Sequence, residues 1–114
     1  MSRKIKVVMC PAERAPYVCA ISNSLENMQR VVGGDIEAVT IDDKCVLICA
    51  EEGRILDMPE NQSCPFAGFV GDVFFCGPDG EEFGDLGDDQ VREILRAAKQ
   101  RWAERNSYER KHPT

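Results

Sequence analysis

VVGGDIEAVTIDDKCVLICAEEG, residues 31–53, is the stretch of this sequence that decides the fold. Its diglycine, Gly33-Gly34, predicts the end of a helix, because glycine takes the left-handed conformation of a helix C-cap at little cost. The alternation over residues 36–41 and the apolar run 45–50 predict two strands joined by a tight turn. The second strand is apolar on both faces, so we expect it inside a sheet that is covered on each side.

Further elements are expected on both sides of this stretch. The pattern predicts two strands and a short helix before it, and a fifth strand and a long amphipathic helix after it: residues 4–10, 17–21, 23–32, 66–76 and 88–105. An irregular segment precedes the fifth strand, and Ile55, Leu56 and Met58 in this segment are expected to lie under the sheet. Asn23 is the expected N-cap of the short helix, and Leu25 is expected on its buried face.

The order of these elements predicts an α+β fold. We expect a mostly antiparallel sheet of about five strands, with one short helix and a C-terminal amphipathic helix packed on it. Phe74 and Phe75 near the end of the fifth strand are expected to point to opposite sides of the sheet, one toward both helices and one away from them. The chain of 114 residues has the size of one domain. That domain is expected over residues 1–105, followed by a frayed tail over residues 106–114.

Charge and hydropathy narrow the classes of function. The net charge of −6 disfavours direct binding to nucleic acid, which needs a basic face, although an acidic protein can approach a basic groove on another protein. Solubility alone is the commoner reason for such a charge. The sequence has no stretch apolar enough for a secretory signal or a membrane span, so a cytoplasmic protein is expected.

Six cysteines occur in the chain: Cys10, Cys19, Cys45, Cys49, Cys64 and Cys76. Most of them lie in apolar runs, where a free thiol behaves as a small hydrophobic side chain. Buried free thiols are therefore the first expectation, and a reducing cytosol disfavours disulfides. A metal role and disulfides stay open as alternatives.

Few residues offer catalytic chemistry. The single histidine, His112, lies in the predicted tail, and no Cys-x-x-Cys motif is present, so we expect no catalytic triad, metal site or cofactor. Carboxylates are plentiful: residues 79–89 contain six acids and no base. Asn61 is expected to be a buried side chain that orders the irregular segment through backbone hydrogen bonds. The candidate interaction residues are Glu51, Glu52, Asn61, Asp79, Glu81, Glu82 and Asp85.

A series of short motifs resembles a known family. The motifs are Leu25-Glu26, Gln29, Val32-Gly33-Gly34, Ile36-Glu37, Val39, Asp42-Asp43, Leu47-Ile48-Cys49, Glu51-Glu52-Gly53, Pro59, Asn61, Gly71 and Phe74-Phe75. They resemble the family called "domain of unknown function 3846", which is met in Gram-positive bacteria, their plasmids, conjugative elements and phages. The resemblance implies a small accessory protein of a phage or mobile element, and the family has no established active site.

Three functions are compatible with the sequence. The first is a non-enzymatic protein that binds and inhibits a host or defence protein, of the anti-CRISPR or anti-restriction type, with the acidic residues facing a basic groove. The second is a small-ligand binder that sequesters a signalling nucleotide, with a pocket near Asn61. The third is a hydrolase with a carboxylate site. The expected partner is another protein, with no direct nucleic-acid or membrane binding, and a homodimer is one state that we consider.

Overall fold

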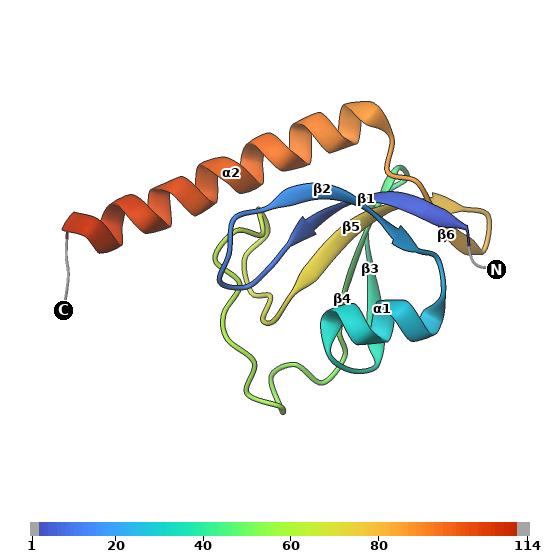
Figure 1. Ribbon diagram of the computed structural model, residues 1–114, viewed down its shortest axis with the longest axis horizontal. Coiled ribbons are helices and arrows are strands. Elements are labelled where there is room, and N and C mark those ends of the chain that lie inside the picture. Colours follow the sequence, from blue (N-terminus) through green and yellow to red (C-terminus); the bar gives the residue numbers. More distant parts are fainter. Residues whose placement is uncertain (1–2, 112–114) are drawn as a thin grey trace.

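Six strands and two helices form the described part of the chain. The computed structural model describes residues 3–111, with side chains up to residue 106. In order, the elements are β1 (Lys4–Cys10), β2 (Tyr17–Ser22), α1 (Leu25–Val32), β3 (Ile36–Asp42), β4 (Cys45–Ala50), β5 (Val73–Asp79), β6 (Glu82–Gly84) and α2 (Asp88–Lys111) (Figure 1). The main sheet has the order β2-β1-β5-β4-β3, and short β6 pairs with the end of β5. The predicted α+β fold with a mostly antiparallel sheet is confirmed.

Two hairpins make the outer parts of the sheet, and β5 joins them. β1 pairs with β2, and β3 pairs with β4 across a turn in which the Lys44 amide donates to Asp42 Oδ1 at 2.8 Å. β5 lies between β1 and β4, where Phe75 pairs with Val8 on one side and with Leu47 on the other. All these pairings are antiparallel. The prediction that β4 lies inside the sheet is therefore correct.

The two helices lie on opposite faces of the sheet, so the fold has three layers (Figure 1). On one face Phe74 packs in a buried cluster with Met28 of α1. On the other face Phe75 packs in a cluster with Ala98 of α2. Consecutive strand residues point to opposite faces, so the two phenylalanines serve one core each. They were expected to face opposite sides, as they do, but the expectation that both helices share one side is wrong.

Helix α1 ends as predicted but begins differently. Gly33 has φ 85° and its amide bonds to the Gln29 carbonyl, which is the expected left-handed C-cap. The N-cap is Ser24, not Asn23, because the Asn23 side chain instead donates to the carbonyl oxygen of Phe83 on β6. Leu25 is 59% exposed, so its predicted place on the buried face is also wrong.

The irregular segment between β4 and β5 is longer than predicted, because the fifth strand begins at Val73 and not at residue 66. Gly68 and Gly71 have positive φ, which turns the chain out of a strand conformation. Met58 packs against the core as expected. Ile55 and Leu56 do not, since they are 82% and 54% exposed on the turn that follows β4.

Helix α2 is longer than predicted, because it continues past residue 105 to Lys111. Fraying of the tail from residue 106 stays a prediction. No glycine or proline interrupts residues 88–111, and the Asn106 side chain donates to the Trp102 carbonyl at 2.8 Å, which supports the last described turns. His112 lies outside the described residues. Neither helix, over the residues described, is long and apolar enough to cross a membrane.

Gly77 on β5 packs closely against the backbone of Asp85, so a substitution at Gly77 tests the geometry of the β5–β6 hairpin. A Cβ at Gly77 would lie 2.1 Å from the carbonyl oxygen of Asp85, a backbone atom that cannot move without shifting the start of α2. We expect Gly77→Ala to lower the free energy of unfolding by about 3 kcal/mol, measured by urea denaturation. Gly80→Ala is the control, because nothing lies near its added Cβ and only its φ of 63° costs about 1 kcal/mol. Equal losses for the two variants would contradict the close contact.

Candidate functional site

The acidic pair Glu51-Glu52 begins the turn that follows β4. The strand ends at Ala50, and residues 51–57 form consecutive turns. The Glu51 amide donates to the carbonyl of Asp35 at 2.8 Å, which fixes the start of the turn beside the end of α1. Both acidic side chains are exposed. The turn therefore presents two carboxylates to solvent at one end of the sheet.

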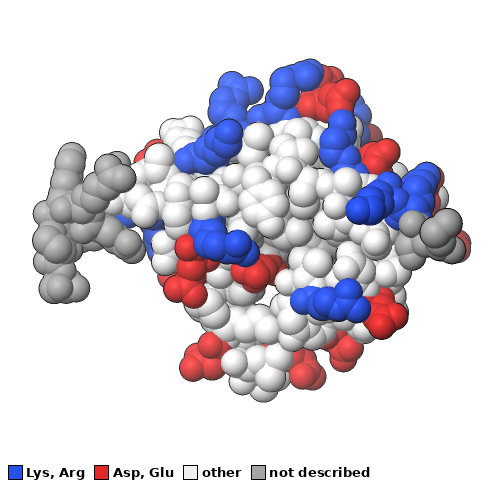
Figure 2. Space-filling model, in the orientation of Figure 1, with Lys and Arg blue, Asp and Glu red and all other residues white. Residues whose placement is uncertain are grey.

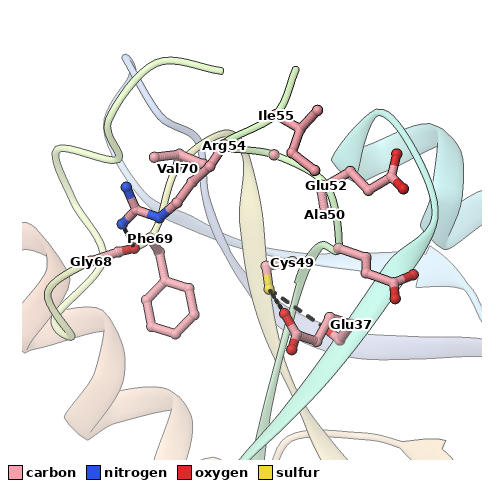
Figure 3. Close-up of a pocket in the computed structure, with 11 residues that line it drawn as sticks. Glu37, Cys49, Ala50, Glu52, Arg54, Ile55, Gly68, Phe69 and Val70 are labelled. Carbon is pink, nitrogen blue, oxygen red and sulfur yellow. Dashed lines mark hydrogen bonds between the residues drawn. The ribbon is translucent and has the colours of Figure 1, made fainter. Parts of the chain in front are cut away.

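A cleft of about 200 Å³ opens beside this turn. Figure 3 shows that side chains from three separate segments line it: Glu37 on β3, Cys49 on β4 and Arg54 and Phe69 from the irregular segment. Arg54 Nη2 donates to the Gly68 carbonyl at 2.5 Å and so bridges the two halves of the irregular segment. The volume is below the 300–1,000 Å³ that is usual for small-molecule pockets.

Glu37, Arg54 and Phe69 were not predicted as site residues. None of them belongs to a motif within its own segment, and only the folding of residues 54–70 over the end of β4 brings them together. A weak signal existed for Arg54, because it is the first base after the acidic pair, from which only Gly53 separates it.

Cys49 is the only sulfur in the cleft lining, and its thiol is poorly suited to act as a nucleophile. Its Sγ lies 3.7 Å from the Glu37 carbonyl oxygen and 3.9 Å from Glu37 Oε1. Burial, followed by the Glu37 carboxylate, raises the pKa of Cys49 to about 11. The thiol is therefore protonated at neutral pH, whereas a nucleophilic cysteine must be a thiolate.

The other cysteines behave as predicted for free core thiols. All six are free and five are buried; Cys19 on β2 is partly exposed. Burial raises the pKa of every one of them, to about 12 for Cys10, Cys45 and Cys76. Among residues 3–111, no group of three His, Cys, Asp or Glu side chains is placed to hold a metal ion.

Asn61 is buried and binds backbone, as the sequence predicts. Its Nδ2 donates to the carbonyl oxygens of Cys10 and Gly71, both at 2.8 Å. Its Oδ1 accepts from the amides of Ser63 and Cys64 at 3.0 and 2.7 Å. The side chain ties the end of β1 to two points of the irregular segment. Its hydrogen-bonding capacity is thereby used inside the fold, so it offers nothing to a ligand.

The other four candidate residues lie on or beside the β5–β6 hairpin, at the end of the molecule away from the C-terminus of α2 (Figure 1). Asp79 pairs with Arg3 at 3.4 Å, and Asp85 Oδ1 accepts from the Lys6 amide at 2.7 Å. Asp85 thus connects the hairpin to β1, and Asp79 forms an exposed ion pair with the residue that precedes β1. Glu81 and Glu82 are exposed and form no ion pair with the described residues.

The structure thus places the candidate residues at two separate acidic surfaces and one buried position. Glu51 and Glu52 border the cleft, whereas Glu81 and Glu82 line a different hollow beside α1, together with Phe83. We call the acidic surface on the β5–β6 hairpin the acidic hairpin, and define it by Asp79, Glu81, Glu82 and Asp85.

The model of one protein family matches residues 5–99, a range that runs from β1 into α2. That model is described as a domain of unknown function (DUF3846). The chain belongs to this family. The resemblance inferred from the motifs is therefore confirmed, and the match includes both acidic surfaces, the cleft and Asn61. No curated protein and no solved structure matches the chain.

Asn61 gives a direct test of how the DUF3846 fold holds its irregular segment. Asn61→Ala leaves two buried carbonyls and two buried amides without their partner, so we expect the free energy of unfolding to fall by about 3 kcal/mol. Ser63→Ala is the matched control. The Ser63 hydroxyl makes only longer contacts of 3.3 and 3.4 Å, and its loss should cost about 1 kcal/mol. Both are measured by urea denaturation, and equal losses would contradict the role given to Asn61.

The carboxylate of Asp88, next to the acidic hairpin, gives a pH-dependent test. An ion pair and hydrogen bond with the Lys6 ammonium hold the pKa of Asp88 below its ordinary value of 3.8. Since the folded pKa is lowered, the stabilisation is present above the unfolded pKa and is lost as pH falls through the folded pKa. In an NMR titration, Lys6→Met should raise the pKa of Asp88 more than Arg92→Met does, because Lys6 is the larger cause. The reverse order would contradict this assignment.

Proposed function

We propose that this protein is a non-enzymatic accessory protein of a phage or mobile element, and that it binds and inhibits a host or defence protein. The proposed contact is between the acidic hairpin and a basic groove that normally holds nucleic acid, as found in restriction and CRISPR nucleases. The family resemblance supplies the setting, since phages and mobile elements meet such proteins in the bacterial cytoplasm. The geometry of the acidic hairpin and the charge of the chain support this contact.

The observation that carries the proposal is how the acidic hairpin is held. Asp85 accepts from the Lys6 amide of β1, and Asp79 pairs with Arg3 just before this strand. Asn23, between β2 and α1, donates to the Phe83 carbonyl. Glu81 and Glu82 are therefore presented on a backbone anchored at three points. A partner meets charges that are already positioned, which lowers the ordering cost of association.

Electrostatics favours a basic partner. The chain carries a net charge of −6, and opposite charges across an interface accelerate association and select against acidic partners. The same charge disfavours DNA or RNA as the direct ligand, because phosphate and carboxylate repel. The surface thus suits the groove of a nucleic-acid-binding protein better than the nucleic acid.

At the cleft beside Glu51, a sequestered nucleotide is disfavoured. The cleft beside Glu51 is small, and the carboxylates of Glu51 and Glu52 at its rim would repel a phosphate. The Asn61 amide, the polar group first considered for such a pocket, is used within the fold. A thiol-based enzyme is disfavoured by the raised cysteine pKa values described above.

The test compares three variants with the same change of charge. They are Glu81→Lys with Glu82→Lys on the acidic hairpin, Glu51→Lys with Glu52→Lys at the cleft, and Glu13→Lys with Glu93→Lys as exposed controls elsewhere. Each protein is assayed for inhibition of DNA cleavage by a panel of restriction and CRISPR nucleases from Gram-positive hosts, over a series of salt concentrations.

We expect the hairpin variant to lose inhibition by at least about tenfold, because two like charges then face the basic groove. The control variant should inhibit as the unmodified protein does. Inhibition by the control variant and by the unmodified protein should weaken as the salt concentration rises. Loss of inhibition in the cleft variant alone would move the interface to Glu51 and Glu52. Absence of inhibition of every nuclease by the unmodified protein, at low salt, would overturn the proposal.

A further inference from the structure

The two edges of the main sheet differ in charge. β3 carries Glu37 and Asp42, and charged side chains on an edge strand discourage further strand pairing. β2, with the sequence YVCAIS, carries no charge, and its Tyr17 and Val18 are 43% and 39% exposed. In Figure 2, which has the orientation of Figure 1, the middle of the visible face has an area without charged side chains, and acidic and basic side chains surround it. β2 lies on this face in Figure 1. The β2 edge therefore lacks the usual protection against strand addition.

The backbone of β2 has free hydrogen-bonding groups on this edge. The Asn23 amide donates to the Arg3 carbonyl at 2.7 Å, which fixes the phase of the β1–β2 ladder. Because bonding direction alternates along an antiparallel strand, Cys19 and Ile21 bond toward β1. Val18 and Ala20 then direct their N–H and C=O groups outward, away from the sheet.

We propose that two copies of this chain pair through β2, antiparallel and centred on Cys19, so that one sheet runs through both. In this register Val18 of one copy lies opposite Ala20 of the other, and each pair exchanges two N–H···O=C bonds. All the outward groups of both residues are then used. Because β2 is uncharged, the pairing brings no like charges face to face.

The ends of β2 fit the same register. Pro16, which lacks an N–H, lies opposite Ser22 of the other copy. The Ser22 carbonyl already accepts from the Ser24 amide at 3.0 Å and from Asn27 Nδ2 at 3.1 Å. The bond that proline cannot donate is therefore one that Ser22 does not need. Shifting the register to centre on Ala20 would remove this match.

The helices leave room for the second copy. Antiparallel pairing about a two-fold axis puts the two α2 helices on the same face of the joined sheet. Since α2 packs mainly against β1, the two helices would lie over strands three positions apart, about 14 Å at the usual strand spacing. Packed helices need only about 8–10 Å.

The first experiment is the oligomeric state by sedimentation velocity over about 1 μM to 1 mM protein, in salt that screens the net charge of each copy. We expect a monomer–dimer equilibrium. Ala20→Pro removes an outward N–H without touching the bonds to β1, and should raise the dimer dissociation constant by at least about tenfold. Ala38→Pro is the matched control: Ala38 is an exposed alanine on β3, and it too directs its N–H outward, because the Glu51–Asp35 bond sets that phase.

The second experiment tests the register through the natural cysteine. Cys19 is the one cysteine that is not buried, and the proposed pairing puts the two Cys19 Cα atoms about 4.5 Å apart, within disulfide range. Mild oxidation of the unmodified protein should give a covalent dimer that Cys19→Ser abolishes. A monomer over the whole concentration range would overturn the proposal, as would a dimer that Ala38→Pro weakens and Ala20→Pro does not. A dimer without the Cys19 cross-link would overturn the register.

Discussion

The insertion of β5 between β1 and β4 is the constraint on which the rest of the structure depends. Without it, the chain would be two separate hairpins, and an isolated hairpin is at best marginally stable in water. β5 supplies one fully buried phenylalanine to each face, Phe74 toward α1 and Phe75 toward α2. Burying a side chain of this size stabilises by about 1.5–3 kcal/mol, so one strand contributes to both cores at once.

That insertion requires the chain to travel from β4 to β5 along a path with no regular structure. Backbone hydrogen bonds form the turns over residues 51–58 and join Asn61 to Phe69 and Gly71 to Pro59 within the segment. Side chains then connect the segment to the rest of the fold. Asn61 ties it to the end of β1, Asp72 Oδ1 accepts from the Ala12 amide at 2.8 Å, and Arg105 on α2 pairs with Glu60 at 3.3 Å. The cleft beside Glu51 is a consequence of this path, because Phe69 and Arg54 reach the end of β4 only along it.

Local patterns predicted the parts of this fold that local forces determine. Strand alternation identified both hairpins, the glycine at Gly33 identified the end of α1, and the consecutive phenylalanines identified a strand with two buried faces. Asn61 was also predicted, because a lone amide in an irregular apolar segment must find backbone partners. These features depend on residues close together in the sequence.

The features that were predicted wrongly depend instead on residues far apart in the sequence. Ser22, Asn23 and Ser24 can all cap a helix, and the choice is made by Phe83, which takes the Asn23 side chain from sixty residues away. The opposite placement of the helices follows from which face each connection crosses, which periodicity does not report. The cleft combines residues from three segments, none of which carries a signal of its own.

Contacts between distant residues also explain the acidic region, residues 79–89, whose sequence shows only six acids and no base. In the fold, Asp79 faces Arg3, Asp85 accepts the Lys6 amide, Asp88 pairs with Lys6 and Asp89 pairs with Arg92. Four of the six carboxylates therefore hold the hairpin and the start of α2 in place. Of these six, Glu81 and Glu82 alone form no ion pair or side-chain hydrogen bond with the described residues. A carboxylate that the fold already uses must give up its partner before it can bind another, whereas an unpaired one need not. These two glutamates, rather than the net charge of the whole region, are therefore the candidate contacts with a partner.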